Sequence, residues 1–157
     1  MREVTVCLPV QGYPARAVLL GLKKRGFGMG KVGGIGGKIE DGETAAVAAA
    51  RELKEEAGLS VAAEELEHIA TLRFLFPARP DWDHLVHVYL ARAWRGTPTE
   101  SGEISPAWFV VDRLPLDQMW DDASYWLPLV LAGQRLQGIF IYAGDNASVG
   151  EFSIEGP

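Results

Sequence analysis

The stretch that decides the fold is residues 37–59, which read GKIEDGETAAVAAARELKEEAGL. If residues 44–57 form a helix with about 100° between successive side chains, Glu52, Glu55 and Glu56 share one arc beside an apolar stripe. The predicted stripe consists of Ala46, Ala49, Ala50, Leu53 and Ala57. Carboxylates at i, i+3 and i+4 repel one another, and Mg2+ prefers a few such oxygens together with water and phosphate. The pattern therefore predicts a metal site for phosphate-ester hydrolysis; the alternative is a solvated helix face in which Arg51 and Lys54 balance the acids.

The same stretch resembles the Nudix box at every defined position. The matching residues are Gly37, Glu43, Arg51, Glu52, Leu53, Glu55, Glu56, Gly58 and Leu59. The resemblance implies the Nudix fold, an α/β (α+β) arrangement in which a mixed β-sheet lies between α-helices. It also implies hydrolysis of a nucleoside diphosphate linked to another group, with bound Mg2+ or Mn2+. The Gly36 carbonyl would join the three glutamates as a metal ligand, and Glu43 would pair with Arg51 to brace the helix.

The similarity covers nearly the whole chain, and segments 20–28, 96–103 and 119–128 resemble the MutT-like 8-oxo-dGTPase branch of this family. That branch hydrolyses oxidised purine nucleoside triphosphates to the monophosphate and pyrophosphate, which sanitises the nucleotide pool and protects DNA. The resemblance implies that Lys23 contacts the substrate and that Phe27 and Trp120 line the base pocket. Glu103 would be a further carboxylate that reaches the metal, and either Glu56 or Glu103 would accept the proton of the attacking water.

Two departures from that branch concern the base pocket. Gly33 stands where an asparagine reads the purine edge, and Ala123 stands where a second aspartate would lie. Asp122 keeps the first purine-facing position, and Asp121 would substitute for the second by a one-residue shift. Fewer polar partners weaken the rejection of wrong bases, so three functions stay open: the oxidised-purine triphosphatase, a Nudix pyrophosphohydrolase of another nucleotide, and a nucleotide-binding sensor without turnover. The other nucleotides considered are unmodified or methylated purine triphosphates, dinucleoside polyphosphates and ADP-ribose.

Several of these side chains also have a purely structural interpretation. Phe27 could serve packing alone, although flanking glycines place it poorly for a regular core element. Asp122 could cap a helix, and Glu103 could be an ordinary surface acid. The lone Cys7 lies in an alternating apolar segment and is expected in the core, and His84 is a candidate neighbour of the pocket.

Composition fits one domain over residues 1–157, with 48% hydrophobic and 23% charged residues. The sequence has no run of about 20 apolar residues that would form a membrane span. Its first residues also lack the apolar core of a signal peptide, so a cytoplasmic location without a membrane partner is expected. The net charge of −6 argues against long nucleic acid as a partner but not against a small nucleotide. The sequence leaves a monomer and a dimer equally open.

Periodicity predicts two helices within a series of strands. The expected helices are residues 44–57, ending at Gly58, and 122–132, with Pro128 in the first turn or at a bend. The expected strands are residues 4–10, 17–22, a short segment into 39, 69–76, 85–91, 108–111, 136–142 and 149–154. Residues 28–33 fit a bare G-x-G-x-x-G pattern, but the chain continues as an extended segment instead of starting a helix, which excludes a dinucleotide fingerprint. A P-loop is also excluded, because Lys38 is followed by Ile39.

Overall fold

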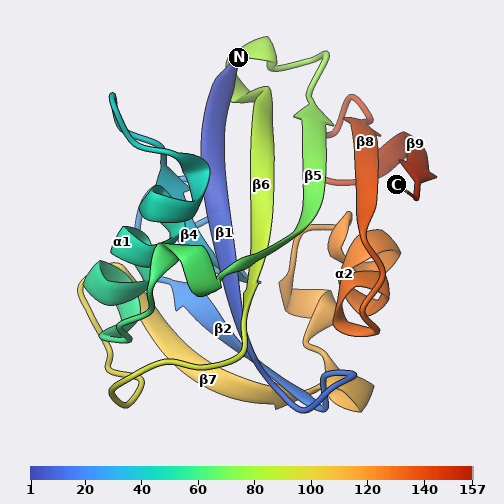
Figure 1. Cartoon of the computed structure of the whole chain (residues 1–157). Coiled ribbons are helices and arrows are strands. Elements are labelled where there is room, and N and C mark those ends of the chain that lie inside the picture. The colour runs from blue at the N-terminus through green and yellow to red at the C-terminus, as the bar shows by residue number, and fades with distance from the viewer. Residues whose placement is uncertain (157) are drawn as a thin grey trace.

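A mixed β-sheet with a helix on each side forms the body of the protein in the computed structural model, which describes residues 1–156 (Figure 1). The strands are β1 (Arg2–Gln11), β2 (Ala17–Lys23), β3 (Val32–Gly33), β4 (Ile35–Lys38), β5 (Glu67–Leu75), β6 (His84–Ala91), β7 (Ile104–Val110), β8 (Leu136–Tyr142) and β9 (Val149–Glu155). The helices are α1 (Ala45–Ala57) and α2 (Ala123–Leu131), with short 3-10 turns at Ala63–Glu65, Pro80–Trp82, Val111–Arg113 and Leu116–Gln118. The predicted arrangement of a mixed sheet between helices is confirmed.

Strand β1 forks the sheet. The strands run in the order β3-β2-β1-β6-β5-β8-β9, while β4 pairs with β1 and β7 pairs with β2. The first part of β1 lies antiparallel to β4, from Val4 opposite Lys38 to Cys7 opposite Ile35, and its end pairs with β2. Along its other edge β1 is parallel to β6. Because β1 separates from β4 and joins β2, a gap opens between the two branches of the sheet.

Two apolar clusters fix the helices on opposite sides of the sheet (Figure 1). Helix α2 contributes Leu127 to the cluster that contains Leu72, whereas α1 contributes Leu53 to the cluster that contains Cys7. Cys7 is fully buried as expected, and burial raises its pKa to about 12. Such a thiol stays protonated and acts as a small apolar side chain.

Helix α1 has well-defined ends. The Thr44 hydroxyl accepts a hydrogen bond from the Val47 backbone N–H at 3.1 Å, which satisfies one of the free donors of the first turn. Gly58 ends the helix with φ 75°, and its N–H donates to the Lys54 carbonyl. This left-handed conformation costs little for glycine, so the predicted stop is confirmed.

The buried face of α1 differs from the predicted stripe. The buried residues are Ala48, Ala49, Leu53, Glu56 and Ala57, whereas Ala46 and Ala50 are only half-buried. The helix covers β4 and β1 with one side and turns the neighbouring arc toward a cavity in the sheet fork. Burial therefore extends to Glu56, which the sequence placed on the arc beside the apolar stripe.

The structure also tests three further expectations from the sequence. The glycine-rich segment continues into the short strands β3 and β4, so the exclusion of a dinucleotide fingerprint is confirmed. Pro128 lies in the interior of α2, so of the two expected placements the one in the first turn was wrong. In residues 1–156, neither helix has the length and apolar character needed to cross a membrane.

Candidate active site

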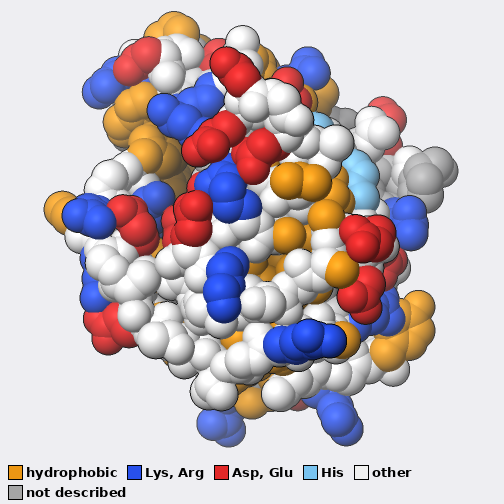
Figure 2. Space-filling view, turned by 60° about the vertical axis from the view of Figure 1, so that its left-hand side comes forward, with side chains coloured by type: hydrophobic (Ala, Val, Ile, Leu, Met, Phe, Trp, Pro, Cys, Tyr) orange, Lys and Arg blue, Asp and Glu red, His pale blue; other side chains and the backbone are white. Residues whose placement is uncertain are grey.

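A cavity of about 240 Å³ lies at the fork of the sheet. Residues of β1, β2 and the loop after β2 form one part of its wall, and the segment that leads into α2 forms another. The polar or charged side chains that line it are Thr5, Lys23, Lys31, Glu56, His84, Trp120, Asp122 and Trp126. Figure 2 shows a face of the molecule on which apolar side chains lie in a hollow, with acidic and basic side chains around it.

Glu56 marks the acidic end of the cavity, where Gly36, Gly37 and Lys23 also belong to the lining. Glu56 is only 8% exposed. Burial raises its pKa to about 8, a hydrogen bond with Glu52 and the charges of Glu52 and Glu103 add to this effect, and Lys23 opposes it. These carboxylates are thus close enough to disfavour each other's charge, a situation that a bound cation relieves.

Arg51 braces the acidic helix against the turn that precedes it. Its Nε and Nη2 donate to the two carboxylate oxygens of Glu43 at 2.7 and 2.8 Å, and Nη2 also donates to the Lys38 carbonyl at 3.0 Å. Its Nη1 donates to Glu52 Oε1 at 2.9 Å. The Glu43–Arg51 pair expected from the resemblance is therefore present, and the hydrogen bonds from Arg51 lower the pKa of Glu43 to about 2.

Replacing Glu43 with Gln is expected to lower the melting temperature at neutral pH, with an effect that shrinks as the pH falls from about 4.5 toward about 2. A carboxyl group whose pKa is depressed on folding stabilises the protein above its unfolded pKa and loses that contribution as the pH falls through the folded value. Thermal unfolding of both proteins across this range measures the gap, and Glu64→Gln on an exposed turn provides the control. A gap that does not narrow toward the acidic end contradicts the role given to the pair.

The four predicted metal-binding carboxylates are not gathered around one point. Glu55 is 57% exposed and faces Arg51 Nη1 at 3.3 Å. Glu103 accepts hydrogen bonds from Arg25, with Nε at 2.9 Å and Nη2 at 2.8 Å. Within residues 1–156, no three His, Cys, Asp or Glu side chains are placed to hold one metal ion. Arg51 and Arg25 each bind one of these carboxylates.

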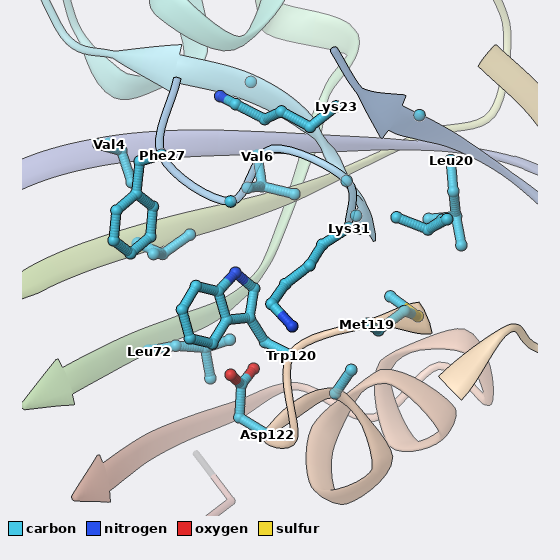
Figure 3. Close-up of a pocket in the computed structure, with 18 of the residues that line it drawn as sticks. Val4, Val6, Leu20, Lys23, Phe27, Lys31, Leu72, Met119, Trp120 and Asp122 are labelled. Atoms are coloured by element: carbon cyan, nitrogen blue, oxygen red, sulfur yellow. The ribbon is translucent and has the colours of Figure 1, made fainter. Parts of the chain in front are cut away.

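Phe27 and Trp120 stand at the other end of the cavity, and both line it (Figure 3). Their rings stack on each other with centroids 5.3 Å apart and planes inclined by 12°. Trp82 packs edge-on against Phe27 at 5.1 Å, outside the stack. Stacked aromatic surfaces of this kind offer a face to a purine ring. Gly33 also lines the cavity, and a β-carbon added there would meet no atom within 4 Å.

Asp122 is the carboxylate at this end, and it is buried. Its Oδ1 accepts a short hydrogen bond from the Tyr142 hydroxyl, and its Oδ2 accepts one from Trp126 Nε1 at 2.8 Å. It precedes α2 but its side chain does not cap the helix, so the alternative of a capping aspartate fails. Burial raises the pKa of Asp122, against the lowering effect of these two donors.

Asp121 does not line the cavity. Its side chain is on the exposed side of the chain and accepts a hydrogen bond from the Val149 backbone N–H at 2.8 Å. The expected one-residue shift, which would let Asp121 replace the aspartate missing at Ala123, is therefore not seen. Ala123 itself is buried and lines the cavity, so this part of the wall is apolar.

Sequence reasoning missed Lys31, and it named His84 only as a candidate neighbour. Both line the cavity. His84 Nδ1 hydrogen-bonds to the Trp82 carbonyl at 2.7 Å, and burial lowers the pKa of the imidazole. The available signal for Lys31 was its place in the same glycine-rich loop as Phe27, a loop that turns tightly where Lys31 N–H donates to the Gly28 carbonyl at 2.9 Å.

The chain resembles known proteins over most of its length. The NUDIX domain family profile matches residues 1–130. Two proteins named oxidized purine nucleoside triphosphate hydrolase are similar in sequence: that of Danio rerio is 44% identical over 146 residues, covering 93% of this chain and 90% of the relative. That of Mus musculus is 46% identical over 139 residues, covering 88% and 85%. The chain therefore belongs to the Nudix family of hydrolases.

Solved structures share the fold. The MutT protein of Bacillus halodurans has a TM-score of 0.81 at 24% identity, with 99% of this chain and 98% of that chain covered. The MutT NUDIX hydrolase of Burkholderia pseudomallei has a TM-score of 0.64 at 27% identity, with 73% and 86% covered. A bifunctional NMN adenylyltransferase/ADP ribose pyrophosphatase of Francisella tularensis, solved with AMP and a manganese ion, has a TM-score of 0.64 at 18% identity, covering 84% of this chain and 41% of that one. Nudix hydrolases generally act on small nucleotides and need divalent metal ions.

Proposed function

We propose that the protein hydrolyses oxidised purine nucleoside triphosphates such as 8-oxo-dGTP to the monophosphate and pyrophosphate, with Mg2+ as the metal. One observation carries the proposal: a single cavity joins the acidic end at Glu56 to the aromatic end at Phe27 and Trp120. The acids would bind the phosphates of a nucleotide through a metal ion, and the aromatic rings would contact its base. The relatives named oxidized purine nucleoside triphosphate hydrolase support the choice of substrate.

The donor set at the acidic end fits a hard divalent cation. Glu52 and Glu56 crowd each other's charge there, and carboxylate and carbonyl oxygens are the ligands that Mg2+ accepts. The metal would be held by Glu52, Glu56 and the Gly36 carbonyl. Glu55 and Glu103 would join these ligands by giving up their arginine contacts for the metal. A bound cation would neutralise phosphate charge and lower the pKa of a water molecule.

The chain's own groups supply the other requirements. The Lys23 ammonium lies near enough to Glu56 to influence its pKa, so it is placed to hold phosphate oxygens beside the acids. Glu56, held out of bulk water, serves as the acceptor of the proton of the attacking water. The stacked pair Phe27 and Trp120 would supply the aromatic surface for the base, and Asp122 fixes the neighbouring wall through Tyr142 and Trp126.

Product analysis tests the proposal directly. The protein is incubated with 8-oxo-dGTP, unmodified purine triphosphates, a dinucleoside polyphosphate and ADP-ribose, each with Mg2+ and with a chelator. We expect monophosphate and pyrophosphate from the oxidised purine triphosphate, only in the presence of metal. AMP from ADP-ribose without pyrophosphate would assign a different Nudix activity, and nucleotide binding without any metal-dependent product would assign a sensor.

A further inference from the structure

Lys31 brings a cation to the base end of the cavity. Its Nζ lies 4.9 Å from the centroid of the Trp120 ring, and Figure 3 shows the amine beside that ring. The backbone of Lys31 is fixed on both sides, because its carbonyl accepts from the Lys23 N–H at 2.9 Å and its own N–H donates to Gly28. Of the two lysines that line the cavity, Lys23 serves the acidic end, so Lys31 is the lysine available to the base.

The amine of Lys31 remains available for hydrogen bonds, whereas the carboxylates at this end of the chain segment already accept hydrogen bonds from other residues. The carboxylate of Asp122 is engaged by Tyr142 and Trp126, and the carboxylate of Asp121 is engaged by Val149. No ion pair within residues 1–156 includes Lys31. An ammonium has three donors and no acceptor, so this end of the cavity offers donors to the edge of a base that lies at the aromatic rings.

The space for such a contact is open at Gly33. A β-carbon at this position would meet nothing within 4 Å, and Gly33 and Lys31 both belong to the cavity wall. A lysine side chain is long and flexible, and a single contact between an ammonium and an aromatic face is weaker than a charge-assisted hydrogen bond. The amine can therefore leave the Trp120 ring for a better acceptor at small cost.

We propose that Lys31 reads the edge of the bound base and selects 6-oxopurines over 6-aminopurines, an inference that rests on the proposed function. The edge of guanine presents the O6 acceptor, and lysine contacts to this edge are common where proteins distinguish bases. The 8-oxo form keeps O6 and adds a second carbonyl oxygen. Adenine presents an N6 amino group at the same position, and this donor faces the Lys31 ammonium without an acceptor.

Binding of nucleoside monophosphates in the presence of a chelator tests Lys31 without any need for turnover. Calorimetry would compare dGMP, 8-oxo-dGMP and dAMP on the wild type, Lys31→Met, Lys31→Arg and Arg113→Met. Arg113 is exposed and does not line the cavity, so its replacement removes one positive charge elsewhere. We expect Lys31→Met to weaken binding of the two 6-oxopurines by about tenfold or more, to leave dAMP nearly unchanged, and to differ from Lys31→Arg, which retains the preference.

An equal loss for all three ligands would overturn the inference, because it would mean that Lys31 acts on the phosphate or through general charge. Unchanged affinities in Lys31→Met would overturn it too. Failure of the proposed function has a separate signature, namely the absence of metal-dependent products from the wild type in the hydrolysis panel. The binding ratio between 6-oxo and 6-amino ligands is measured without metal, so it decides the role of Lys31 independently.

Discussion

Replacing Glu56 with Gln is expected to lower kcat for the preferred triphosphate by about 100-fold or more, the range in which loss of a positioned general base falls. Glu56 is the buried member of the acidic helix, and it is the one whose side chain lines the cavity. Gln keeps the shape of the side chain but neither accepts the proton of water nor binds a hard cation as a carboxylate does. Steady-state kinetics at saturating Mg2+ measure the loss.

The fold should survive this change. Burial raises the pKa of Glu56 to about 8, so in metal-free protein the neutral carboxyl is the favoured form at neutral pH and Gln mimics it. We expect the melting temperature of Glu56→Gln in chelator to be no lower than that of the wild type. Glu64→Gln, on the exposed turn Ala63–Glu65, serves as the matched control and should keep full kcat. Retention of wild-type kcat by Glu56→Gln would refute the role given to this residue.

The acidic helix was predictable because its determinants are local. A helix repeats every 3.6 residues, and its ends depend on side chains within one turn. Thr44 and Gly58 therefore mark its ends in the sequence as they do in the structure. The Glu43–Arg51 pair was not predictable from spacing, since the two residues are eight apart, and it came from the family resemblance.

The positions of Asp121 and Asp122 depend on contacts that no local pattern contains. The hydroxyl of Tyr142, at the end of β8, holds the carboxylate of Asp122 inside the protein, and the N–H of Val149, at the start of β9, holds that of Asp121 outside. Both partners lie twenty or more residues further along the chain. Adjacent aspartates are equivalent in sequence, and only the packing of β8 and β9 assigns one to the cavity and the other to the surface.

The charged contacts at the acidic end also could not be predicted from local sequence. The sequence places Glu103 in a loop far from the helix, and its contact with Arg25 spans 78 residues. The sheet creates that contact by pairing β2 with β7, which brings Lys23 opposite Ile104. Lys31 was not predicted for a similar reason. A lysine in a glycine-rich loop has the sequence pattern of a solvated charge, and only the fold places Trp120 beside it.

Replacing Gly36 with Ala is expected to destabilise the protein by about 3 kcal/mol or more, at the upper end of the range for overpacked sites. A β-carbon at Gly36 would lie 1.8 Å from the Thr5 carbonyl oxygen and 2.9 Å from the Val6 α-carbon, and both belong to the backbone of β1. Backbone atoms cannot rotate away as a side chain does. Strand β4 must therefore move off β1, which breaks a register that pairs Val6 with Gly36.

The consequence for the site follows from the same strand. Gly37 lies against the Glu52 carboxylate, so a displaced β4 also disturbs the acidic end of the cavity. Gly33→Ala is the matched control, because its added methyl group meets no atom within 4 Å. Where the backbone is compatible, Gly→Ala stabilises by about 0.4–1 kcal/mol, so urea unfolding should place Gly33→Ala at or above the wild type and Gly36→Ala far below it. Equal stability of the two variants would show that β4 does not need to lie against β1 as the structure places it, and the acidic end of the cavity would then lack the support assigned to it.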